Sequence, residues 1–133
     1  MRNLLALCLL ATALMAATCK TNQQLPAQVF GQTWLHSFEE DSADVRIYRS
    51  NTFDFPPSRG RTGFTLKEDG TFIRYGIAPT DGLEEQPGTW KATGKNRVKA
   101  QLEGRQEPAQ EMELLTVEPG KLRVRQLRTT GQD

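Results

Sequence analysis

The sequence has almost no cysteine and a single histidine. Its two cysteines are Cys8 and Cys19. Cys8 lies in an N-terminal apolar stretch that is expected to be removed, which leaves Cys19 as the last thiol and excludes an internal disulfide. His36 alone cannot build a histidine-rich zinc site. The fold is therefore expected to depend on apolar burial and strand pairing, with no cofactor or metal.

An excess of charge of one sign is also missing. The formal net charge is +1, and it falls to zero without residues 1–19, whose only charged residue is Arg2. Such a chain has no global attraction for nucleic acid or for anionic lipid. Glycine-rich phosphate loops, Cys-x-x-Cys pairs and paired catalytic carboxylates are absent from the sequence as well. We therefore expect a protein that is not an enzyme and does not bind nucleic acid.

Long apolar runs are lacking except at the N-terminus. Leu4–Leu14 is apolar apart from Thr12 and follows Arg2, but it is too short to span a bilayer comfortably. Residues 1–19 therefore predict an export signal. Small residues directly before Cys19 resemble the lipobox of bacterial lipoproteins, and this resemblance implies a lipid on Cys19 that anchors the protein to a membrane of the cell envelope.

An ordinary secretory signal, cleaved within residues 13–18, is the alternative to lipidation. It would give a periplasmic or secreted soluble protein. In both cases residues 20–30, which are polar and contain Pro26, are expected to form a short tether. One domain follows at residues 31–128, and residues 129–133 are expected to fray.

Short alternating segments separated by turn residues dominate the rest of the chain, and no long helical period interrupts them. The clearest signal is Asp69-Gly70 between two apolar, β-branched segments, which predicts a tight hairpin. Near Trp34 the alternation predicts an inner face of Trp34, His36 and Phe38. The expected strands are eight: residues 32–39, 45–49, 62–67, 71–77, 88–93, 97–102, 110–117 and 122–127.

Eight antiparallel strands in a meander predict an all-β domain. Closure into a barrel, complete or nearly so, removes the edges that would pair with other chains. A barrel of this size is either filled by side chains or holds one small ligand. We expect the protein to be a monomer.

Four short motifs resemble those of the small lipocalin-like lipoproteins of Bacteroidota-type bacteria. They are Gly31-Gln32-Thr33-Trp34, Thr65-Leu66-Lys67-Glu68-Asp69-Gly70-Thr71-Phe72, Gly88-Thr89-Trp90 and Leu122-Arg123-Val124. The resemblance covers most of residues 31–127. It implies a small antiparallel barrel that is displayed from a membrane or secreted.

The segment from Ser50 to Arg61 is the predicted binding loop. Two adjacent prolines exclude it from a central strand, and a connection of this length is often functional. Its guanidinium groups could bind a carboxylate or phosphate. The predicted ligand-binding residues are Arg59, Arg61, Phe53, Phe55 and Tyr75. The alternative is that the arginines of this region pair with the acidic residues between 39 and 44.

Three other groups have a functional and a structural interpretation. His36 could be a base, but adjacent Ser37 would point to the opposite face of a strand, which favours a partly buried barrel residue. Four carboxylates could bind calcium or form a solvated turn: Glu39, Glu40, Asp41 and Asp44. Trp34 and Trp90 could stack on a ligand or plug the barrel floor.

These features predict an exported, lipid-anchored binding module that holds a small or amphipathic ligand, either apolar or anionic, at the barrel mouth. Residues 50–61 and 78–85 would surround this mouth. The alternative is a structural or protein-interaction barrel with a filled interior. A cavity of a few hundred Å³ open to solvent would favour the binding module.

Overall fold

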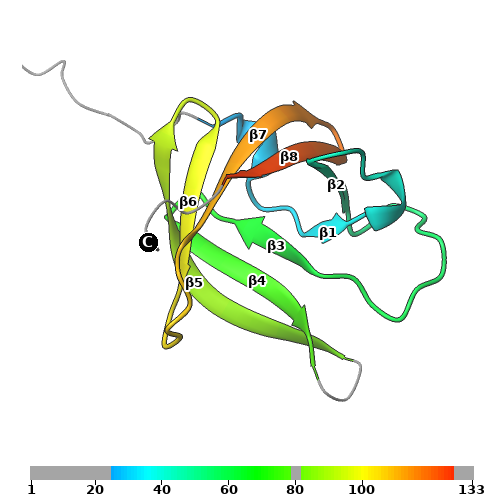
Figure 1. The fold of residues 1–133 in the computed structure, drawn as a ribbon, viewed down its shortest axis with the longest axis horizontal. Coiled ribbons are helices and arrows are strands. Elements are labelled where there is room, and N and C mark those ends of the chain that lie inside the picture. The colour runs from blue at the N-terminus through cyan, green and yellow to red at the C-terminus, as the bar shows by residue number, and fades with distance from the viewer. Residues whose placement is uncertain (1–24, 79–81, 128–133) are drawn as a thin grey trace, which may run out of the picture.

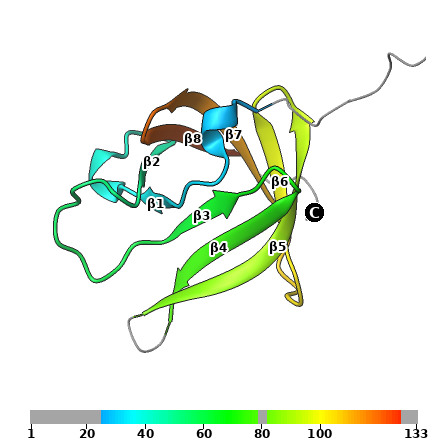
Figure 2. The same ribbon diagram turned by 180° about the vertical axis from the view of Figure 1, so that it is seen from behind.

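A closed antiparallel β-barrel forms the folded part of the protein. The computed structural model describes residues 25–78 and 82–127 (Figures 1 and 2). Its strands follow one another around the barrel in the order β1-β2-β8-β7-β6-β5-β4-β3. Their bounds are β1 Trp34–His36, β2 Val45–Ser50, β3 Gly63–Leu66, β4 Thr71–Ile77, β5 Leu83–Gly94, β6 Arg97–Leu102, β7 Gln110–Glu118 and β8 Lys121–Leu127. The predicted all-β barrel is confirmed.

Strand order departs from a simple meander at one place. From β3 to β8 each strand pairs with the next, but β1 lies between β2 and β3. The connection over residues 51–62 must therefore pass β1. Asn51 N donates to Thr33 O at its start, and Thr62 O accepts from His36 N at its end. This β2–β3 loop thus runs along the outside of the barrel beside β1 (Figure 1).

Two strand predictions need correction. The first strand is only three residues long, because the chain turns at Ser37 into a 3-10 helix, η2, over Phe38–Glu40. Phe38 is consequently 49% exposed and not part of the interior. The loop expected over residues 78–85 is shorter, since Leu83 pairs with Ile77 and Glu85 pairs with Tyr75 in a long hairpin.

One end of the barrel is closed by the segment before β1. Residues 27–29 form a 3-10 helix, η1, and Leu25 and Val29 are buried. The Phe30 ring stacks on Trp90 with 5.6 Å between centroids. The predicted tether of residues 20–30 is therefore corrected: from residue 25 onward the chain packs on the core.

The closed end holds the apolar core, which is built from inward side chains of every strand. Its most buried large members are Trp34, Leu66, Phe72, Leu114 and Leu122. Opposite this end lie the start of β3, the hairpin between β4 and β5, and the connection between β6 and β7. This open end has a different lining.

The predicted signal over residues 1–19, the lipid attachment at Cys19 and the frayed tail after residue 128 lie outside the described residues. Within residues 25–78 and 82–127, no helix has the length and apolar character that a membrane crossing requires.

Candidate functional site

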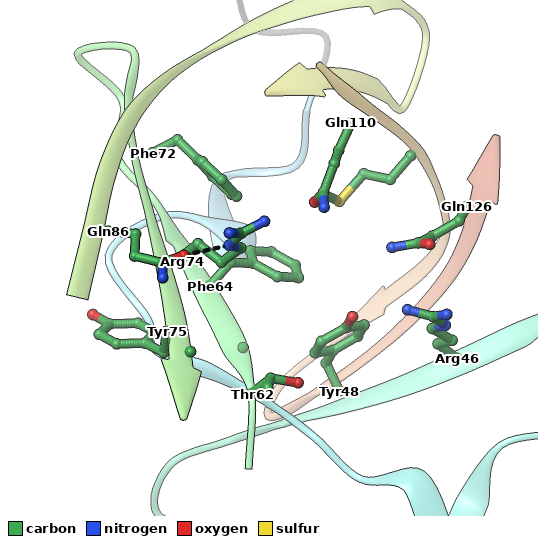
Figure 3. Close-up of a pocket in the computed structure, with 13 residues that line it drawn as sticks. Arg46, Tyr48, Thr62, Phe64, Phe72, Arg74, Tyr75, Gln86, Gln110 and Gln126 are labelled. Carbon is green, nitrogen blue, oxygen red and sulfur yellow. Dashed lines mark hydrogen bonds between the residues drawn. The ribbon is translucent and has the colours of Figure 1, made fainter. Parts of the chain in front are cut away.

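A pocket of about 290 Å³ occupies the open end of the barrel (Figure 3). Its floor is aromatic and apolar, and its wall carries arginine and glutamine side chains. The floor is made by Tyr48, Phe64, Phe72 and Met112, and the wall by Arg46, Arg74, Gln86, Gln110 and Gln126.

Strand alternation places these polar side chains inside the barrel. Arg74 follows buried Phe72 by two residues on β4, and Gln126 follows buried Val124 by two residues on β8. Side chains two residues apart in a strand share a face. Gln86 pairs directly with Arg74 across β4 and β5. The pocket wall thus continues, toward the open end of the barrel, the same inward-facing rows of side chains that form the core.

Arg74 is the best-positioned charged group of the pocket. Its Nε donates to Gln86 Oε1 at 2.6 Å, and Gln86 is itself buried. Its Nη1 and Nη2 donate to the two carboxylate oxygens of Glu107, at 2.9 and 3.4 Å. Hydrogen bonds from Arg74 lower the pKa of Glu107 below its ordinary value of 4.5. The guanidinium is therefore fixed by β5 on one side and by the β6–β7 connection on the other.

The aromatic rings of the floor pack against one another, edge to face for Tyr48 with Phe64 and tilted for Phe64 with Phe72. The Tyr48 and Phe64 rings lie 4.9 Å apart, and the Phe64 and Phe72 rings lie 6.2 Å apart. Burial raises the pKa of Tyr48, so its hydroxyl stays protonated at neutral pH. Its ring also stacks on His36 at 5.2 Å. This floor offers an apolar surface directly below the charged wall.

Arg46 lies across the pocket from Arg74, next to Gln126 (Figure 3). Within the described part of the chain, no carboxylate oxygen lies within 4.0 Å of its guanidinium nitrogens. The pocket thus combines one arginine held by a carboxylate with a second arginine that has no carboxylate partner among residues 25–78 and 82–127.

Arg61, a predicted ligand-binding residue, is buried outside this pocket. Its guanidinium pairs with Glu39 at 2.6 and 2.8 Å and donates to the carbonyl oxygens of His36 and Pro56. It also lies over the rings of Phe38 and Phe55, at 4.8 and 4.4 Å. The alternative interpretation of this arginine, pairing with the acidic turn, is confirmed.

The other residues predicted for the site are dispersed. Phe53 and Phe55 contact one another at 4.9 Å on the outside of the barrel, and Arg59 is exposed. Tyr75 is counted in the pocket lining, but its hydroxyl hydrogen-bonds Thr65 and its ring points away from the pocket centre (Figure 3). Of the five predicted residues, only Tyr75 borders the pocket.

The acidic turn and His36 are paired with each other and with the arginines. Glu40 accepts from Arg49 at 2.6 Å and from Ser37 Oγ at 2.8 Å. His36 Nε2 lies 2.8 Å from Asp41 Oδ2, and its ring is half-buried against Tyr48. The prediction of His36 as a partly buried barrel residue is confirmed. No cluster of three metal-binding side chains occurs within residues 25–78 and 82–127.

The two tryptophans belong to the closed end. Trp34 Nε1 donates to Val29 O at 3.0 Å, and Trp90 Nε1 donates to Lys67 O at 2.7 Å. Both rings are buried, and neither lines the pocket. Their role as floor-plugging residues is thus favoured over stacking on a ligand.

The sequence-based search missed Arg74, Gln86, Gln110 and Gln126. A usable signal existed, because each of them continues the alternation of an apolar inner face by one more step. A polar residue at an inward position marks either a cavity or an end of the barrel. Glu107 gave no such signal, since it lies in an irregular connection.

Comparison with protein-family models, with curated proteins and with solved structures gives no match for this chain. The resemblance to lipocalin-like lipoproteins consequently remains a prediction that rests on the four short motifs.

Proposed function

We propose that this protein is a non-enzymatic binding module that holds one small amphipathic molecule in the open end of its barrel. The observation that carries the proposal is the pocket of about 290 Å³, with an apolar floor below a wall of arginine and glutamine. Ligand pockets of proteins are typically concave and largely apolar, with a few convergent polar groups. A filled interior, as in a purely structural barrel, would leave no such space.

The orientation of the ligand follows from the lining. Its apolar part would rest on Phe64, Phe72 and Met112, where contact with water is lost. Its polar part would stay at the mouth, near Arg46 and Arg74. The opposite orientation would bury a polar group against Phe64, Phe72 and Met112, whose side chains offer it no strong hydrogen bond, which is unfavourable.

A fluorescence titration with the uncharged apolar dye N-phenyl-1-naphthylamine tests the proposal. We expect saturable binding with one site per chain. Gln126→Trp places a large ring in the mouth and should abolish this binding. Thr116→Trp is the matched control, because Thr116 is an exposed residue of β7 that does not line the pocket. Absence of saturable binding, or equal binding by Gln126→Trp, would contradict the proposal.

Native mass spectrometry of the protein purified from its host is the complementary experiment. A bound molecule in the wild type that is missing from Gln126→Trp supports the binding module and gives the mass of the ligand. Wild-type protein that carries nothing, and whose stability is unchanged across a panel of lipids and metabolites, favours the structural barrel.

We also propose that the module is exported and anchored by a lipid on Cys19, as the N-terminal sequence suggests. Labelling of cells with a fatty-acid analogue tests the anchor. Label should enter the wild type but not Cys19→Ser, and a labelled Cys19→Ser variant refutes it.

A further inference from the structure

An ion pair between Arg74 and Glu107 lies at the wall of the pocket. Arg74 is fixed by Gln86 and points into the pocket (Figure 3). Glu107 comes from the β6–β7 connection and is not part of the pocket lining. Its carboxylate caps the guanidinium end-on, with one oxygen on each terminal nitrogen. The contact with Glu107 therefore shows that a carboxylate fits the terminal nitrogens of Arg74.

This ion pair is accessible to water on both sides. The exposed fraction of the side chain is 22% for Arg74 and 43% for Glu107. Ion pairs that are this accessible contribute little to stability, because water competes for both charges. A ligand carboxylate that displaces Glu107 from Arg74 would therefore break only a weak ion pair.

The surrounding contacts allow Glu107 to leave without unfolding its loop. Gln101 Nε2 donates to the backbone oxygen of Glu107 at 2.9 Å, and Glu103 N donates to Pro87 O at 2.9 Å. These bonds hold the backbone, so rotation of the side chain is sufficient. Arg105 Nη1, 3.5 Å from Glu107 Oε1, is a second cationic group beside this carboxylate.

The charge balance changes in the direction that favours an anion. With Glu107 in place, one of the two arginines of the pocket wall is neutralised. When its side chain rotates away, Arg46 and Arg74 both face the cavity with only glutamines beside them in the wall. An arginine guanidinium can bind a carboxylate with two parallel hydrogen bonds, which is the arrangement that Glu107 makes with Arg74.

We propose that the ligand of this pocket carries a carboxylate that binds Arg74 in place of Glu107, so that Glu107 acts as a built-in competitor. This inference rests on the proposed function and specifies its ligand class as amphipathic carboxylic acids. A ligand without an anionic head group cannot displace Glu107, so its affinity comes only from contact with the apolar floor.

Displacement of N-phenyl-1-naphthylamine by two matched competitors tests the inference. Octanoate and octan-1-ol share an apolar chain and differ in the head group. At neutral pH we expect octanoate to be the stronger competitor for the wild type. Glu107→Gln should raise the affinity for octanoate about two- to fivefold, since the competing ion pair is lost. The affinity for octan-1-ol should not change.

Two further variants complete the design. Arg74→Met keeps a long side chain at this position. It should lower the affinity for octanoate about tenfold or more and leave the affinity for octan-1-ol unchanged. Glu103→Gln is the matched control for Glu107→Gln, because it removes the same charge from the same connection. Circular dichroism and urea unfolding show independently of the pocket that each variant is folded.

The inference fails if Glu107→Gln shifts both competitors equally, if Glu103→Gln has the same effect, or if Arg74→Met leaves octanoate unchanged. Displacement by octan-1-ol but not by octanoate would also overturn it, while the proposed binding function would stand. Lack of dye binding in the wild type would instead contradict the proposed function itself.

Discussion

At the scale of single residues, Gly63 determines how closely β1 and β3 approach. A Cβ built at this position would lie 1.9 Å from the carbonyl oxygen of Trp34, far inside any real contact distance. The β1–β3 ladder has only two residue pairs, and one of them is Leu35 with Gly63. Because this ladder closes the ring of strands, the carbonyl oxygen of Trp34 cannot move away without separating β1 from β3.

We therefore predict that Gly63→Ala lowers the free energy of unfolding by about 2–3 kcal/mol, as expected for a side chain forced into a packed site. Urea unfolding followed by tryptophan fluorescence measures the change. Gly82→Ala is the control, because a Cβ at residue 82 has no neighbour within 4 Å. Equal stability of the two variants would show that the strands can separate at this point without loss.

Glu40 links stability to pH through its hydrogen bonds. Those from Arg49, assisted by Ser37, lower its pKa from 4.5 to about 2 in the folded protein. A lowered pKa means that the charged form is favoured by folding. Its contribution is complete above the unfolded pKa and disappears as the pH falls toward the folded pKa.

For Glu40→Gln we predict a loss of about 1 kcal/mol at neutral pH, after allowance for the exposure of the carboxylate. The difference between wild type and variant should shrink as the pH falls from about 4.5 to about 2. Thermal unfolding across this range measures it. Glu68→Gln, at an exposed turn, is the charge-matched control and should equal the wild type at neutral pH. A difference that grows toward acid pH would contradict the assignment.

At the scale of elements, the β2–β3 loop is held to the barrel by Arg61. The guanidinium lies between Phe38 of η2 and Phe55 of the loop, and its hydrogen bonds reach Glu39, His36 and Pro56. A planar fork is needed to stack between two rings and to bind a carboxylate with two hydrogen bonds at once, and the compact ammonium of lysine cannot do both.

We predict that Arg61→Lys destabilises the protein by about 2 kcal/mol and releases the loop. Hydrogen exchange should accelerate in residues 51–62 more than in β4–β8. Arg59→Lys is the matched control, because Arg59 is exposed and donates no hydrogen bond to the described residues. If instead Arg59→Lys accelerates exchange as much, then the loop is not held by Arg61.

The strands from β3 onward could be predicted from sequence, because their signals are local. Alternation and turn residues place β4 and β6 at their observed bounds, and each of these strands pairs with its neighbour in the chain. The position of β1 could not be predicted in this way, since its pairing with β3 depends on contacts across a long loop. For Arg61 the sequence allows two interpretations, a binding residue or a partner of the acidic turn, and only the position of η2 beside the loop distinguishes them.

At the scale of the whole molecule, the barrel has one end filled by the apolar core and one end with an open pocket. The closed end is dry and crowded, with Leu66, Trp34 and Val29 fully buried. At the open end the same inner faces carry arginine and glutamine around a cavity. Polar groups there keep contact with water and hence add little to the free energy of folding. Stability and binding should consequently respond to different substitutions.

This separation predicts opposite outcomes for two inward side chains. Leu66→Ala leaves a cavity at the closed end and should cost about 3 kcal/mol of unfolding free energy, while dye binding stays within about twofold. Gln126→Trp at the mouth should change the unfolding free energy by less than about 0.5 kcal/mol and abolish dye binding. Urea unfolding and dye titration of both variants measure this. Because Leu66 does not line the pocket, comparable losses of affinity in the two variants would mean that the core and the pocket respond as one unit.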